Sequence, residues 1–99
     1  MTKKAEKMLA TYTEKMEIHT DLFVRHGEEY KEEGKLDKRY EFTKMIIEDL
    51  RTDFVAMIGG MYRFDMLSEK DFEELMKESS DLYISMKDTI FEKYFEIKY

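Results

Sequence analysis

Apolar residues recur every three or four positions along almost the whole chain. In three successive segments the spacing follows one face of a 3.6-residue helical repeat, and strand-like alternation is absent over any useful length. We therefore predict an all-α chain with helices over about residues 3–33, 37–64 and 68–98. Long helices joined by short connections pack in alternating directions, so we expect one antiparallel, up-down-up bundle forming a single domain over residues 1–99.

Residues typical of helix ends separate the three segments. Gly34 can supply the left-handed residue that closes the first helix, and Asp37 is the expected N-cap of the second. Ser68, with Asp71 three residues later, forms a capping-box-like pair at the start of the third. These residues predict two short connections.

A pair of glycines lies inside the second segment. Gly59 and Gly60 could end the helix early or remain within it at a cost of roughly 1 kcal/mol each. Because the apolar spacing continues through Met61 and Phe64, we expect a continuous helix to about Phe64.

Composition narrows the classes of function. The absence of cysteine excludes a disulfide scaffold and a thiolate zinc site, and it fits a reducing cytosol. A net charge of −6 argues against a nucleic-acid or anionic-membrane surface. No apolar run approaches the ~20 residues that span a bilayer. We therefore expect a cytoplasmic protein that binds neither nucleic acid nor membrane directly.

Catalytic motifs are absent from the sequence. No serine lies in a Gly-x-Ser-x-Gly turn, and no glycine-rich loop has the pattern of a phosphate-binding site. Histidine occurs only at His19 and His26. We therefore predict no catalytic residues, no cofactor and a non-enzymatic function.

The two histidines lie within the first apolar stripe, seven residues apart. That spacing separates their backbones by about 10.5 Å, too far for one metal ion, and only His26 with Glu29 has chelating spacing. We expect both to be core-edge residues with hydrogen-bonding partners. The alternative function is a bundle that binds a small ligand or metal between its helices. Its polar lining would be His19, His26, Tyr12, Tyr30, Tyr40 and Tyr83.

Several large apolar residues lie outside the stripes. In the first segment they are Ile18 and Leu22. In the other two they are Phe42, Met45, Ile84, Phe91, Phe95 and Tyr99. An up-down-up bundle places Phe42 and Met45 at the same end of the molecule as Phe91, Phe95 and Tyr99. We predict that these six residues form a partner interface, with homodimerisation as one form of it.

Acidic residues are concentrated at the start of the third segment. The members of this predicted acidic surface are Glu69, Glu73, Glu74, Glu78 and Asp81. Such a cluster is typical of a solvated helix face, and it is also compatible with docking on a basic partner. The function that we predict is a small regulator or inhibitor that binds a larger protein through an apolar, aromatic face and acidic surfaces.

Overall fold

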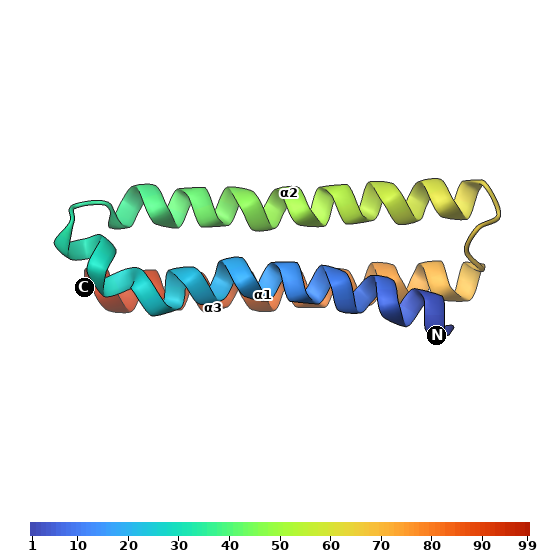
Figure 1. Cartoon of the computed structure of the whole chain (residues 1–99), viewed down its shortest axis with the longest axis horizontal. Helices are drawn as coiled ribbons and strands as arrows, with labels where there is room; N and C mark the ends of the chain where they lie inside the picture. The colour runs from blue at the N-terminus through green and yellow to red at the C-terminus, as the bar shows by residue number, and fades with distance from the viewer.

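Three long helices make up nearly all of the molecule. The computed structural model describes residues 1–99 and contains no strand. Helix α1 spans Lys3–Glu32, α2 spans Leu36–Arg63 and α3 spans Glu69–Lys98 (Figure 1). Each helix begins and ends within one residue of its predicted bound, which confirms the all-α prediction. No helix combines the length and the apolar character that crossing a membrane requires.

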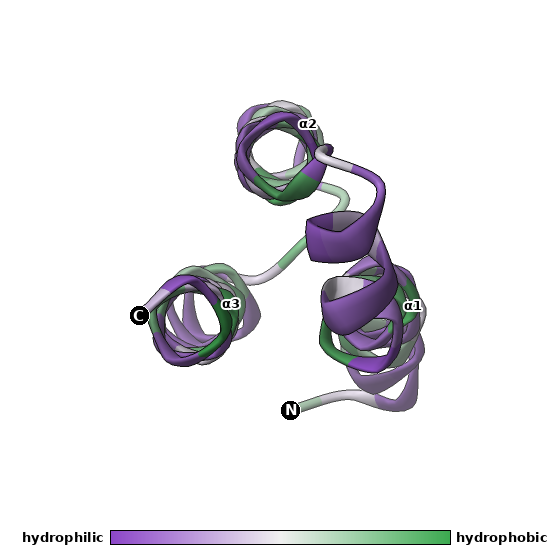
Figure 2. Ribbon diagram, turned by 90° about the vertical axis from the view of Figure 1, so that its left-hand side faces the viewer, coloured by the Kyte–Doolittle hydropathy of each residue, from purple (hydrophilic) through white to green (hydrophobic).

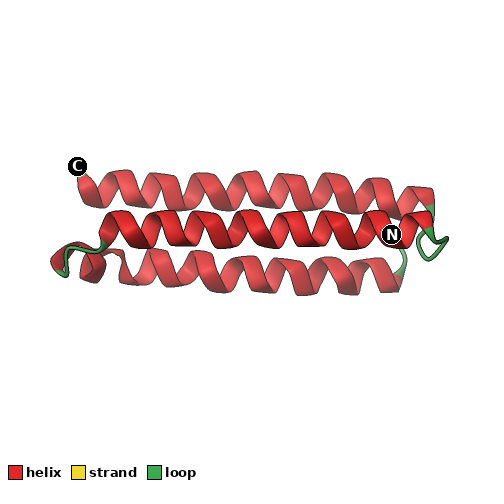
Figure 3. Cartoon of the chain, turned by 90° about the horizontal axis from the view of Figure 1, so that it is seen from above, coloured by secondary structure: helices red, strands yellow, loops and turns green.

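The helices form a long, thin bundle. Viewed end-on they stand at the corners of a triangle, and each contacts both of the others (Figure 2). Neighbours in sequence run in opposite directions, as Figure 3 shows, and the bundle measures 50 × 18 × 16 Å. The antiparallel prediction is confirmed. The C-terminal ends of α1 and α3 therefore lie beside the start of α2 (Figure 1).

Residues from the predicted apolar stripes fill the centre. The largest fully buried apolar side chains are Phe23, Met16, Ile47, Ile58, Leu75 and Ile90. Three stacked ring pairs cross between helices, with ring centroids 4.5 Å apart for Tyr12 and Phe54, 4.2 Å for Tyr40 and Tyr94, and 4.7 Å for Tyr62 and Phe72. Burying each large apolar side chain contributes roughly 1.5–3 kcal/mol to folding, so this axial core holds the three helices together.

The end of α1 has the predicted left-handed glycine. Gly34 has a φ of +71°, and its N–H donates to the carbonyl of Lys31 at 3.0 Å. The N–H of Lys35 reaches back to the carbonyl of Tyr30 at 2.7 Å. This pair of bonds is a Schellman motif, which satisfies carbonyls that the helix end leaves open.

Asp37 is not the N-cap of α2, so that prediction was wrong. Lys35 occupies the cap position and makes no side-chain cap bond, while Asp37 lies in the first helical turn. The Asp37 carboxylate instead accepts hydrogen bonds from the Tyr94 hydroxyl at 2.5 Å and from Lys98 at 3.3 Å. These bonds from α3 hold the pKa of Asp37 below its usual range, the one from Tyr94 having the larger effect.

Ser68 is the N-cap of α3, as predicted. Its hydroxyl accepts the N–H of Asp71 at 3.1 Å. The carboxylate of Asp71 does not complete the capping box, because it accepts from the hydroxyl and the N–H of Thr2 at 2.6 and 3.2 Å. Thr2 itself caps α1 by accepting the N–H of Ala5. Asp71 thus joins the starts of α1 and α3.

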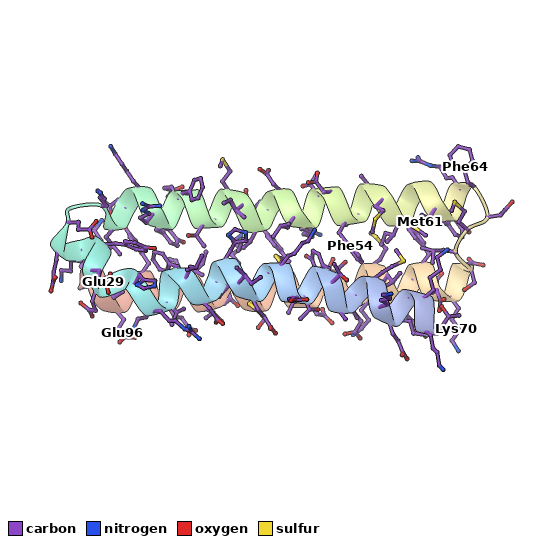
Figure 4. The ribbon with its side chains drawn as sticks, in the orientation of Figure 1. Glu29, Phe54, Met61, Phe64, Lys70 and Glu96 are labelled. Carbon is purple, nitrogen blue, oxygen red and sulfur yellow. The ribbon has the colours of Figure 1, made fainter.

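Helix α2 continues through Gly59 and Gly60, as predicted, and ends at Arg63. Phe64 is the exception to the stripe prediction. It lies just beyond the helix, is 79% exposed and projects away from the bundle, whereas Met61 packs against the core (Figure 4). Asp65 then reverses the chain with a φ of +60°.

Candidate interaction surfaces

Four of the predicted interface residues follow one another along the outside of α3. Ile84, Phe91, Phe95 and Tyr99 are 55%, 52%, 54% and 80% exposed, and we call them the aromatic strip. The ring centroids of Phe91 and Phe95 are 6.1 Å apart, and those of Phe95 and Tyr99 are 4.7 Å apart. Phe91, Phe95 and Tyr99 therefore form a continuous aromatic ridge at the C-terminal end of α3, and Ile84 lies two turns before Phe91.

Contacts with α2 show which side of α3 carries the strip. Phe91 lies two turns before Lys98, which bonds Asp37 of α2. It also lies three turns after Ser80, which accepts a hydrogen bond from Arg51 of α2 at 3.3 Å. The strip therefore borders the side of α3 that faces α2.

The other two predicted interface residues lie elsewhere. Phe42 and Met45 are each 49% exposed and belong to the same end of the molecule as the strip. Phe42 precedes Asp53 by three helical turns, and Asp53 lines a groove between α2 and α1. Phe42 is thus on the α1 side of α2, and Met45 points outward. The structure gathers Phe91, Phe95 and Tyr99 but separates Phe42 and Met45 from them.

The predicted acidic residues divide between two sides of α3. Glu74 pairs with the N-terminal amine at 3.2 Å, and Glu78 follows it one turn later on the α1 side. Asp81 points outward and pairs with Lys77 at 3.0 Å. Glu73 lies two turns before Ser80, which bonds Arg51 of α2, and Glu69 lies one turn before Glu73. These two residues are therefore on the side of α3 that faces α2.

Both histidines are half-buried residues of α1. The His26 imidazole lies 3.4 Å from the Glu29 carboxylate, and its ring centroid is 6.3 Å from that of Tyr30. No group of three or more histidine, cysteine or acidic side chains is placed to hold a metal ion. The His26–Glu29 pair therefore has no third ligand beside it.

Two of the four core tyrosines, Tyr12 and Tyr83, have hydroxyl partners within the bundle, whereas the hydroxyls of Tyr30 and Tyr40 form no hydrogen bond. Tyr12 donates to the carbonyl of Ser79 at 3.3 Å, and burial raises the pKa of Tyr12 to about 12. Tyr83 donates to Glu48 at 3.3 Å, and burial is the main cause that raises its pKa as well. The hydroxyls of Tyr12 and Tyr83 thus stabilise helix packing.

Arg51 is an interior contact that the sequence reasoning missed. Its guanidinium lies 4.9 Å from the centroid of the Tyr83 ring and donates to Ser80. The sequence feature that predicts such a contact is the position of Arg51, three residues before Phe54 and four after Ile47, which are both buried. A long side chain at the edge of an apolar stripe can lay its stem along the core while its charged end reaches a neighbouring helix.

A groove between α1 and α2 was also missed. It has a volume of about 500 Å³ and lies between the first half of α1 and the second half of α2. Its walls combine side chains from two helices, so the pattern along either helix alone could not predict it.

No protein-family model, curated protein or solved structure matches the chain.

Proposed function

We propose that the chain is a non-enzymatic protein-interaction module that regulates or inhibits a larger protein by covering a site on it. The observation that carries the proposal is the aromatic strip, which leaves four large apolar side chains more than half exposed in one line. Large exposed apolar patches on soluble proteins mark interaction surfaces.

The strip has the physical properties of an interface core. Its residues are mostly aromatic, the type enriched at interfaces, and all but the C-cap residue Tyr99 stand on a regular helix that needs little ordering on binding. Beside them the Asp37, Tyr94 and Lys98 side chains form a hydrogen-bonded polar cluster. A polar border around an apolar centre is the usual anatomy of a specific interface.

In the absence of its target, we propose that the strip pairs with that of a second copy. A two-fold dimer places the same surface on both sides of the contact, and the strip supplies such a self-complementary apolar ridge. Full burial of a large apolar side chain is favourable by roughly 1.5–3 kcal/mol, and each residue of the strip is still between 52% and 80% exposed. The isolated protein is then a homodimer, and the target replaces the second copy when it binds to the strip.

The acidic residues contribute to docking in this proposal. Glu74 and Glu78 on the α1 side of α3, and Asp81 on its outer side, attract a basic region of the target. Attraction between exposed charges is screened within about 10 Å at 0.1 M salt, so this contribution weakens as salt rises. We further propose a cytoplasmic location, which the absence of cysteine supports.

Affinity capture from source cells tests the proposed function. The bait is the full chain, compared with the double variant Phe91→Asp and Phe95→Asp. A matched control, Ile18→Asp with Leu22→Asp, changes two exposed apolar residues of α1 in the same way. We expect one stoichiometric partner to bind the wild type and the control but not the strip variant. Equal capture by all three proteins would contradict the proposal.

A further inference from the structure

The α1–α2 groove has an entirely apolar floor. Met8 and Tyr12 contribute from α1, and Leu50, Phe54 and Met57 contribute from α2. The Tyr12 and Phe54 rings of the floor stack on each other, and Phe54 projects from α2 toward the other helices (Figure 4). Because the Tyr12 hydroxyl donates to a carbonyl of α3, the floor offers a ligand no free hydrogen-bonding group.

The rim of the groove is cationic. Lys4, Lys7, Thr11 and Lys15 line it from α1, and Asp53 lines it from α2. The Thr11 hydroxyl is satisfied by a backbone carbonyl one turn earlier, at 3.1 Å. The side chains of Lys7, Lys15 and Asp53 form no hydrogen bond or ion pair, and Lys4 donates only to a carbonyl of the α2–α3 connection at 3.3 Å. Three ammonium groups thus face one carboxylate, although the whole chain has a net charge of −6.

The acidic residues of this part of α1 are on another side. Glu6, Glu14 and Glu17 line a separate shallow hollow of about 370 Å³. Three of the four lysines in the first half of α1 therefore line the groove, Lys3 being the exception, while its three carboxylates line the other hollow. This segregation gives the groove a local positive potential that an anionic ligand would meet.

The positive charge is strongest at one end of the groove. Because Phe54 stacks on Tyr12, the neighbouring Asp53 lies level with the middle of the floor. Lys7 and Lys4 lie five and eight residues before Tyr12, about 7.5 and 12 Å along the helix toward the start of α1. Residues three apart are neighbours on a helix surface, so these two ammonium groups can contact one anion together.

We propose that this groove binds a single-chain anionic amphiphile, with its aliphatic chain on the Tyr12–Phe54 floor and its carboxylate between the ammonium groups of Lys4 and Lys7. The volume of about 500 Å³ falls in the range of small-molecule sites, roughly 300–1,000 Å³. An apolar floor without free polar groups suits an alkyl chain, and ammonium groups without a carboxylate partner suit a carboxylate. This site is distinct from the aromatic strip, and neither proposal depends on the other.

Calorimetric titration of the full chain with dodecanoate, below its micelle concentration, tests the proposal. We expect saturable binding of one dodecanoate per chain. The charge reversals Lys4→Glu and Lys7→Glu together weaken it about tenfold or more, because they replace attraction by repulsion. Met57→Asp, at a half-exposed floor position, weakens binding as well.

Two controls separate the site from general adhesion. The variant Lys38→Glu with Lys70→Glu makes the same change in net charge at exposed lysines outside the groove, and we expect less than about a twofold effect. Dodecyltrimethylammonium carries an equal chain with a positive head, and we expect it to bind at least about tenfold more weakly. No saturable dodecanoate binding, equal losses in both lysine variants, or equal affinity for the cationic amphiphile would overturn the proposal. So would binding of an acidic amphipathic peptide without binding of dodecanoate, since the groove would then belong to a partner helix.

Discussion

Asp71 shows how much of this fold depends on single polar residues. It is 4% exposed, and its carboxylate accepts two hydrogen bonds from Thr2. The hydroxyl bond is the main cause that lowers the pKa of Asp71 below its ordinary value of 3.8. Since Thr2 and Ser68 are the N-caps of α1 and α3, one carboxylate links two helix starts that are far apart in sequence.

This linkage predicts a pH dependence of stability. A carboxyl whose folded-state pKa lies below the unfolded value stabilises the fold above about pH 4 and loses that contribution as the pH falls through the folded-state pKa. Urea unfolding of Asp71→Asn should therefore show lower stability than the wild type at pH 7. The difference should shrink at pH 3. A difference of the same size at both pH values would contradict the role of the charge.

Asp65 is a second residue with a specific backbone role. Its φ of +60° is a left-handed conformation that glycine adopts without strain. We expect Asp65→Gly to raise the free energy of unfolding by roughly 0.5–1 kcal/mol, measured by urea unfolding. Glu33→Gly is the matched control, because Glu33 ends α1 with a φ of −81° and gains no such relief. Equal effects of the two changes on the free energy of unfolding would contradict backbone strain at Asp65.

At the scale of the helices, apolar spacing together with Gly34 and Ser68 predicted every helix bound to within a residue. These signals are local, because a stripe and an end residue act within one helix. One prediction made from local sequence was wrong, because contacts with another helix determine what the residue does. Asp37 was assigned to a cap from its own segment, but Tyr94 and Lys98 of α3 bind its carboxylate.

The candidate surfaces also divide into features that a single helix determines and features that depend on a neighbouring helix. Exposure of the aromatic strip followed from its distance from the apolar stripe of α3. The separation of Phe42 and Met45 from the strip could not be predicted in this way, because that separation depends on how α2 is rotated between α1 and α3. The lysine-rimmed groove required the side chains of two helices together, so no single stripe contained a signal for it.

The glycine pair in α2 gives a prediction at this scale. A Cβ atom built at Gly59 or Gly60 meets no atom within 4 Å, so alanine fits at both positions. We expect Gly59→Ala and Gly60→Ala each to raise the free energy of unfolding by about 1 kcal/mol, since glycine is the poorer helix former. Thermal or urea unfolding of the single variants measures this gain.

Gly27 is the matched control within α1. It is buried, and a Cβ atom there would collide with Cδ1 of Ile97, so Ile97 must move to accept it. We expect Gly27→Ala to gain less than the α2 variants or to lose stability. A larger gain at Gly27 than at Gly59 and Gly60 would contradict this packing.

At the scale of the whole molecule, the long and thin shape determines what is left exposed. A bundle of 50 × 18 × 16 Å has one narrow axial core, so a helix can bury only one stripe of its circumference. The apolar residues beyond that stripe lie on different sides of the bundle. The aromatic strip is on the side of α3 that borders α2, and the lysine-rimmed groove is between α1 and α2. Distinct sides of one small bundle can therefore serve distinct ligands.

Light scattering during size-exclusion chromatography tests the central claim most directly, that the aromatic strip is a protein-binding surface. We predict a homodimer for the wild type and a folded monomer for Phe91→Asp with Phe95→Asp, because two buried, unpaired charges oppose association. The control Ile18→Asp with Leu22→Asp should remain a dimer. Circular dichroism should show the same helix content in all three proteins. A monomeric wild type, or a dimer that the strip variant leaves intact, would contradict self-association through the strip.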